Sequence, residues 1–86
     1  MTKISDSQII DALVDYVLAN YASPFDRQTL PRDQSLVEIG VLDSYGVVEL
    51  VSFMEGHWHI QILDAEITRE KMGSIIKMAQ LVAQKL

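Results

Sequence analysis

The chain has 86 residues, of which 49% are hydrophobic, and it carries a formal net charge of −5 and no cysteine. The length suits a single domain over residues 1–86, and without cysteine the chain has neither disulfides nor thiolate–metal sites. An acidic chain without a basic stripe argues against nucleic acid and anionic membranes as partners. No apolar run approaches the roughly 20 residues that span a membrane.

The start and the composition of the chain also bear on its location and assembly. Residues 1–6 do not read as a signal peptide, so we expect a cytoplasmic protein without membrane insertion. Because Met1 opens the chain and no linker ends it, we expect a discrete protein and not an excised module. We further expect a monomer.

The first predicted element is an amphipathic helix over about residues 6–20. Its apolar residues recur at i, i+3, i+4 and i+7, and Ser5 with Gln8 has the spacing of a capping box. Asn20 is the predicted terminator, because asparagine tolerates the left-handed conformation that often ends a helix. The apolar positions are Ile9, Ile10, Leu13, Val14, Val17 and Tyr21.

Residues 21–43 follow no helical or strand period and are predicted to form a long connection. Two prolines and Gly40 interrupt the segment, and Ser35 with Glu38 has the spacing to cap one short turn. Loops this long are unusual in so small a domain and are often functional. The residues expected to turn inward are Leu36, Val37, Ile39 and Leu42.

The second predicted helix begins at Asp43 or Ser44 and runs to about His57. It is apolar on more than one side, which is expected of a central helix or of one that offers a docking face. Gly46 weakens the first turn by roughly 1 kcal/mol relative to alanine, so its presence indicates a close approach by another segment.

Two further helices are predicted after a short loop. Asp64 is the expected cap of a brief third helix that covers part of residues 65–71. Ser74 is the expected N-cap of a last helix, whose apolar stripe reaches Leu86. We therefore predict an all-α fold, a small bundle of three longer helices and one short third helix.

The methionines and aromatic residues near the second and third helices have two interpretations. Met54, Met72 and Met78, with Phe53 and Trp58, either fill the core or line a cargo cleft. Such residues at helical spacing are more often core, so the core interpretation is favoured.

Asp43 and Ser44 stand where the long loop meets the second helix. Taken alone, an Asp-Ser pair before a helix is more often only a cap. A helix start nevertheless offers unpaired N–H groups and a partial positive charge, so a phosphate ester on Ser44 is electrostatically favoured there.

The residues around Asp43 and Ser44 favour a functional role for this pair over capping alone. Residues 40–50 read Gly-Val-Leu-Asp-Ser-Tyr-Gly-Val-Val-Glu-Leu. This pattern resembles the attachment motif of the acyl carrier and peptidyl carrier protein family, of the standalone type. Ser-Leu-Val-Glu-Ile-Gly at 35–40 is similar to the family's approach to that motif, and the resemblance runs through residues 35–86.

The resemblance continues beyond the attachment motif. Trp58 falls where an aromatic residue usually closes the family's second helix. Ile-Gln-Ile-Leu-Asp at 60–64 is similar to the family's turn, with Leu63 in place of its proline. Met-Gly-Ser at 72–74 resembles the entry to the last helix of aminoacyl and peptidyl carriers.

The resemblance implies a carrier and not an enzyme. Ser44 would receive 4′-phosphopantetheine from coenzyme A, with Asp43 as the recognition partner of the phosphopantetheinyl transferase. An acyl, aminoacyl or peptidyl group would ride on this arm as a thioester. The other implied partners are an acyl- or aminoacyl-activating ligase and the downstream transferases of a biosynthetic pathway. The expected docking residues are Leu42, Tyr45, Val48 and Glu49, with part of the third helix.

Two departures from the family pattern bear on the cargo. The second helix has only Glu49 and Glu55 as acidic residues, and Tyr45-Gly46 replaces a more usual leucine–acidic pair. The docking face is therefore more apolar, and recognition should depend less on salt. This favours an aminoacyl, peptidyl or other specialised acyl cargo over fatty-acid partners, and leaves the cargo, pathway and loading enzyme open.

Other functions have less support. The chief alternative is a small helical protein–protein interaction module, in which Ser44 is only a cap and no prosthetic group is attached. A carrier-like protein that has lost its modification is a second alternative, against which the intact Asp43-Ser44 pair argues. No third metal ligand accompanies His57 and His59, and no nucleophile elbow surrounds Ser44, so neither a metal site nor a hydrolase is expected.

Overall fold

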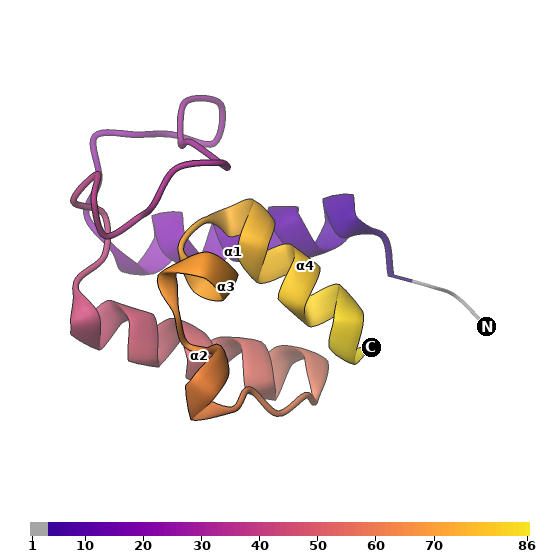
Figure 1. The fold of residues 1–86 in the computed structure, drawn as a ribbon. Helices are drawn as coiled ribbons and strands as arrows, with labels where there is room; N and C mark the ends of the chain where they lie inside the picture. The colour runs from indigo at the N-terminus through magenta and orange to yellow at the C-terminus, as the bar shows by residue number, and fades with distance from the viewer. Residues whose placement is uncertain (1–3) are drawn as a thin grey trace.

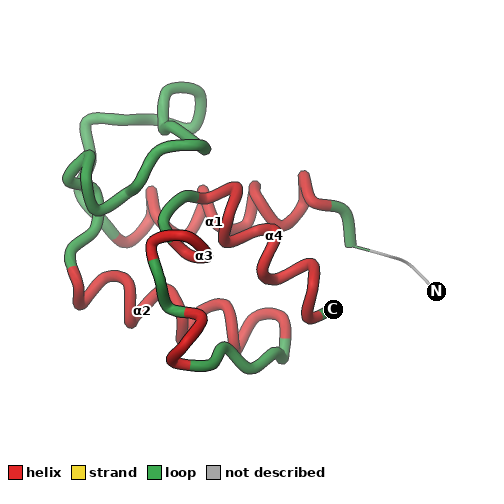
Figure 2. Tube along the Cα trace, in the orientation of Figure 1, coloured by secondary structure: helices red, strands yellow, loops and turns green. Residues whose placement is uncertain are grey.

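A computed structural model describes residues 4–86, and within this range all of the regular secondary structure is helical, with no strand. Figures 1 and 2 show the helices lying around a shared interior, with a long loop before α2. The predicted all-α bundle is confirmed, and the first three residues of the predicted domain lie outside the described range. The elements are α1 (Asp6–Asn20), α2 (Ser44–Trp58), a short 3-10 helix (Asp64–Glu66), α3 (Arg69–Met72) and α4 (Ile75–Lys85).

Helix α1 begins with the predicted capping box. The Gln8 backbone N–H donates to Ser5 Oγ at 3.2 Å, and the Ser5 N–H donates to Gln8 Oε1 at 2.9 Å. The helix ends at residue 20 as predicted, but the predicted left-handed conformation of Asn20 is wrong. Asn20 stays in the helix and its amide donates to the Tyr16 carbonyl at 2.8 Å. The helix ends because Tyr21 adopts an extended backbone, with φ −128°.

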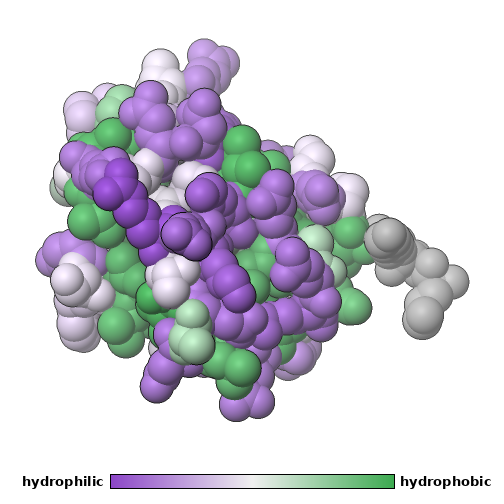
Figure 3. All heavy atoms as spheres, in the orientation of Figure 1, coloured by the Kyte–Doolittle hydropathy of each residue, from purple (hydrophilic) through white to green (hydrophobic). Residues whose placement is uncertain are grey.

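The core lies where α1, α2 and α4 meet, and α1 and α4 pack directly against each other. Met54 and Met78 are almost fully buried in it, so the core interpretation of these two methionines is confirmed. On the face shown in Figure 3, hydrophilic side chains cover most of the surface, with hydrophobic patches between them. Fully buried large side chains come from the helices and the long loop: Ile9, Leu13, Leu30, Leu36, Leu50, Met54, Ile75 and Met78.

The long loop is attached to the corner between α3 and α4. The Leu36 N–H donates to the Gly73 carbonyl at 3.1 Å, and the Ile76 N–H donates to the Arg32 carbonyl at 2.9 Å. Leu36 and Leu42 turn inward as predicted, and Ile39 is half-buried. Val37 is 50% exposed, so its predicted inward position is wrong, because its side chain lies at the rim of a cleft described below.

The predicted third helix is divided into two short elements. Asp64 begins the 3-10 helix and does not cap α3, since Ile67 departs from helical geometry at ψ 69° and interrupts the segment. Thr68 is the cap, and its Oγ1 accepts from the Lys71 N–H at 3.2 Å. Ser74 caps α4 as predicted, accepting from the Lys77 N–H at 3.2 Å.

An ion pair joins the 3-10 helix to the end of α4. Lys85 Nζ, near the end of α4, lies 2.8 Å from Glu66 Oε1 of the 3-10 helix. The hydrogen bond from Lys85 lowers the pKa of the Glu66 carboxyl below its usual range, with help from the Leu63 N–H. The 3-10 helix is therefore held against the last turn of α4.

Candidate functional site

Ser44 is the first residue of α2, and its side chain is exposed to solvent. Asp43 is the N-cap, with an extended backbone, and its Oδ1 accepts from the Gly46 N–H at 2.8 Å. The predicted attachment residue Ser44 and its predicted recognition partner Asp43 thus both lie at the start of α2. No hydrogen bond joins the Ser44 side chain to another of residues 4–86.

The loop that leads to Ser44 is fixed by its own backbone. The carbonyl of Leu36 accepts from the N–H groups of both Val41, at 2.9 Å, and Leu42, at 3.1 Å. Gly40 forms this turn with φ +81°, a conformation that costs glycine little and other residues more. Because Val41 and Leu42 are also buried, the serine is presented from an anchored segment.

The first turn of α2 lies close to Tyr21, at the end of α1. A Cβ added to Gly46 would lie 3.1 Å from Leu42 Cδ2 and 3.4 Å from Tyr21 Cε1. The Tyr21 hydroxyl donates to Glu49 Oε1 at 3.0 Å and lies 3.4 Å from the Gly46 carbonyl. The close approach predicted at Gly46 is confirmed, and Tyr21, expected only as an apolar position of the first helix, makes contacts with α2 that the sequence did not indicate.

The Tyr21–Glu49 hydrogen bond should be measurable in stability. Burial raises the pKa of the Tyr21 hydroxyl well above its usual range, and the bond to Glu49 adds to this. Tyr21→Phe should lower the free energy of unfolding by about 0.5–1.5 kcal/mol. Because the folded pKa lies above the unfolded value of about 10, this advantage is present below pH 10 and shrinks as the pH rises beyond it.

Urea denaturation of both proteins at pH 8 and pH 10.5 would measure this effect. A constant difference between the wild type and Tyr21→Phe across that range would contradict the raised pKa. No difference at either pH would contradict the contribution of the hydrogen bond itself.

The four predicted docking residues differ in their exposure. Tyr45 and Val48 are 71% and 58% exposed on the outer side of α2. Leu42 is only 5% exposed, so its side chain belongs mainly to the core. Glu49 is half-buried and bonded to Tyr21. Tyr45 and Val48 therefore offer the free apolar surface beside Ser44.

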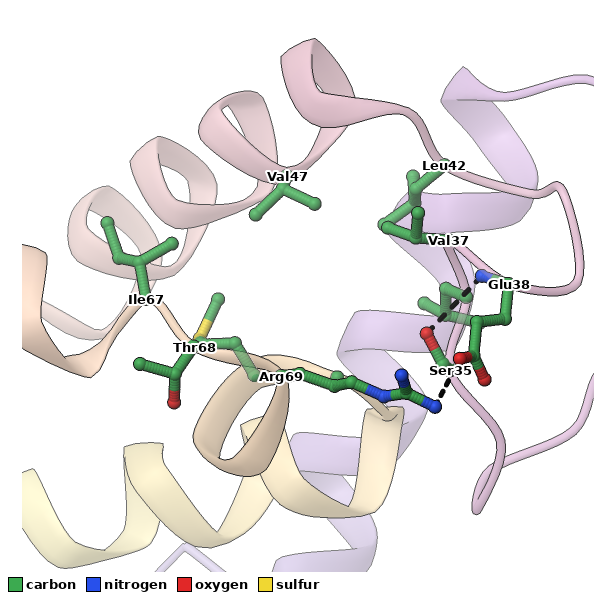
Figure 4. A pocket seen from close by; sticks show the side chains of 11 residues that line it. Ser35, Val37, Glu38, Leu42, Val47, Ile67, Thr68 and Arg69 are labelled. Atoms are coloured by element: carbon green, nitrogen blue, oxygen red, sulfur yellow. Dashed lines mark hydrogen bonds and ion pairs between the residues drawn. The ribbon is translucent and has the colours of Figure 1, made fainter.

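An apolar cleft lies on the other side of α2, between the long loop and α3, and encloses about 280 Å³ (Figure 4). Met72, 6% exposed, belongs to both the core and this cleft. Arg69 and Ile67 also line it, and sequence reasoning missed both, because only the folded chain brings α3 opposite the loop. The full lining is Ser35, Leu36, Val37, Glu38, Leu42, Val47, Ile67, Thr68, Arg69, Met72 and Gly73.

No family model matches the sequence. Comparison with curated proteins, however, finds carrier proteins, in agreement with the resemblance noted from the sequence. The D-alanyl carrier proteins of Streptococcus pyogenes serotype M5 (strain Manfredo), serotype M49 (strain NZ131) and serotype M1 are each 35% identical to this chain over 52 residues. The aligned segment covers 60% of this chain and 66% of each relative, just under two thirds of their length. This similarity supports the placement of the chain in the carrier protein family.

Within residues 4–86, the two histidines and the acidic side chains do not assemble a second kind of site. His57 stacks on Phe53 with ring centroids 5.1 Å apart, and His59 ends α2 in a left-handed conformation. Both histidines lie about 20 Å along the helix from Ser44, too far for a nucleophile–base pair. Among residues 4–86, no group of three His, Cys, Asp or Glu side chains is placed to hold a metal ion. In the same range, no helix is both long and apolar enough to cross a membrane.

Proposed function

We propose that this protein carries an acyl group, as a thioester, on 4′-phosphopantetheine attached to Ser44. The observation that carries the proposal is the exposed Ser44 at the first position of a capped, anchored helix. Its hydroxyl is accessible, and the helix N-terminus favours the negative charge of a phosphodiester. The arm, when bound, supplies the thiol that the cysteine-free chain lacks.

The residues around Ser44 position and present the arm. Asp43 keeps the first turn of α2 in place, and Tyr21 holds that turn against α1. A tethered cargo meets a docked enzyme at a high effective concentration, so the protein itself needs no acid or base. Transfer of the arm and of the cargo falls to partner enzymes: a phosphopantetheinyl transferase, an activating ligase and downstream transferases.

The proposed partners dock on an apolar surface. Tyr45 and Val48 supply exposed apolar area next to Ser44. Both acidic residues of α2 are engaged within the protein, since Glu49 accepts from Tyr21 and Glu55 Oε2 accepts from the Ile62 N–H at 2.9 Å. Docking should then depend on contact more than on charge, and rim charges mainly affect association rate and salt dependence.

The proposed cargo is an aminoacyl group or another specialised acyl group. The support is the name of the relatives, D-alanyl carrier protein, together with the weakly charged α2. The modified protein is incubated either with a ligase that activates D-alanine or with one that activates a fatty acid. The intact mass then shows whether an aminoacyl or a fatty acyl group has been attached, and we expect the aminoacyl gain. A fatty acyl gain alone would contradict the aminoacyl proposal and leave the attachment proposal intact.

The attachment proposal is tested by counting thiols. Because the chain has no cysteine, every thiol must come from the arm. Incubation with coenzyme A, magnesium and a broad-specificity phosphopantetheinyl transferase, followed by desalting and thiol titration, should give one thiol per chain. A folded sample that gains none, beside a control carrier that gains one, would contradict attachment and favour the interaction-module alternative.

The proposed recognition role of Asp43 can be separated from its capping role. Asp43→Asn keeps a capping oxygen of similar strength and removes the charge. We expect a nearly unchanged free energy of unfolding and a modification rate about tenfold lower, since a contact worth about 1.4 kcal/mol is lost. Asp43→Ala should in addition lose about 0.5–2 kcal/mol of stability. Modification of Asp43→Asn at the wild-type rate would restrict Asp43 to capping.

A further inference from the structure

The cleft behind α2 has two walls from distant parts of the sequence. One wall is formed by the loop and α2, with Val37, Leu42 and Val47 facing the hollow (Figure 4). The opposite wall is formed by residues 67–73, which include Ile67 and the single turn of α3. Access to the apolar interior therefore depends on how firmly α3 is held against the loop.

The wall formed by residues 67–73 packs against α4 and is joined to the loop by a backbone hydrogen bond. The backbone bond from the Leu36 N–H to the Gly73 carbonyl, at 3.1 Å, fixes the end of α3. Inside the turn, the Met72 N–H donates to the Thr68 carbonyl at 2.7 Å, and the Gly73 N–H donates to the Arg69 carbonyl at 3.0 Å. A helix of four residues is not stable alone, so its place must be set by contacts with its surroundings.

One of those contacts spans the mouth of the cleft. The Arg69 guanidinium extends from α3 to the carboxylate of Glu38 on the loop, and the two form an ion pair (Figure 4). The Arg69 and Glu38 side chains are 73% and 53% exposed. Within residues 4–86 this is the ion pair that joins α3 to the loop. Such exposed pairs are weak and are screened by salt.

We propose that the Arg69–Glu38 ion pair is a latch that holds α3 over the apolar cleft and limits access to its interior. With the pair made, Met72 is almost fully buried. With the pair broken, α3 separates from the loop more often, and Met72 becomes reachable from solvent. This inference does not depend on the attachment at Ser44, because the latch residues belong to the unmodified chain.

Because the chain has no cysteine, a single introduced cysteine can serve as the probe of access to the cleft. In Met72→Cys, the rate of labelling by a small thiol reagent reports how often the cleft opens. Adding Glu38→Gln should raise this rate about two- to five-fold, the effect an exposed ion pair supports. A rise of similar size is expected for Met72→Cys alone in 1 M NaCl, because salt weakens ion pairs between solvent-exposed side chains. The variant with Glu38→Gln should respond little to salt.

Two matched controls separate the latch from general loosening. Arg27→Gln removes an exposed arginine that pairs with Asp11 and Asp15 of α1, and it should leave Met72→Cys labelling unchanged. Met78→Cys probes a core position, 1% exposed, that does not line the cleft. Its labelling should not respond to Glu38→Gln. Equal labelling of Met72→Cys with and without Glu38→Gln, or equal increases at both probe positions, would overturn the latch.

A second measurement avoids the cysteine variants, in case Met72→Cys folds poorly. Hydrogen exchange of the Met72 and Gly73 amides should be about two- to five-fold faster in Glu38→Gln than in the wild type. The Met78 amide, which donates to the Ser74 carbonyl at 2.9 Å, should exchange at the same rate in both. Unchanged exchange at Met72 and Gly73 would contradict the proposal.

Discussion

Ser44→Ala should abolish the gain of phosphopantetheine completely and leave the fold unchanged. The side chain is exposed and joined by no hydrogen bond to residues 4–86, so its loss should change the free energy of unfolding by no more than about 0.5 kcal/mol. Incubation with coenzyme A and a transferase, followed by thiol titration, should therefore give one thiol for the wild type and none for Ser44→Ala.

Ser52→Ala is the matched control for this prediction. Ser52 is also an exposed serine of α2, but it lies about two turns beyond the helix start. Its replacement should leave modification complete. A thiol on Ser44→Ala, or its loss from Ser52→Ala, would show that the attachment residue is assigned wrongly.

Met54→Ala should lower the free energy of unfolding by about 2–5 kcal/mol, the usual cost of removing a buried methionine side chain. Met54 is fully buried, lies in α2 and does not line the cleft. Because small domains are stable by only about 5–15 kcal/mol, this loss is a large part of the total. Urea denaturation followed by circular dichroism would measure it.

The same variant tests how tightly Met54 is packed in the core. A loss of less than about 1 kcal/mol in the free energy of unfolding would contradict tight packing of the Met54 side chain on the buried side of α2. Ser52→Ala, two positions earlier on the exposed side, should change stability by no more than about 0.5 kcal/mol. A large loss for Met54→Ala together with almost no change for Ser52→Ala would show that the lost stability comes from core packing and not from a change in the helix itself.

Elements with local signals could be predicted from the sequence. The capping box of Ser5 and Gln8 begins α1 where expected, and Ser74 begins α4. These signals work because a cap and its partner lie within one turn of each other. Asn20 failed for a related reason: the tolerance of asparagine for a left-handed backbone does not force it, and Tyr21 leaves the helix extended to reach α2.

Features that depend on distant residues could not be predicted. Tyr21 and Glu49 are bonded across 28 positions of sequence, and no periodicity indicates that pairing. The Arg69–Glu38 ion pair likewise forms only because the loop is fixed to Gly73. The resemblance to the carrier motif singled out Ser44 as a candidate, whereas the cleft on the other side of α2 could be found only in the folded chain.

The intact mass of the wild-type protein, before and after incubation with coenzyme A, magnesium and a phosphopantetheinyl transferase, tests the proposed function most directly. We expect a gain of one phosphopantetheine, which peptide mapping then places on Ser44 and on none of the other serines. An unchanged mass in a folded sample, under conditions that modify a control carrier, would contradict it.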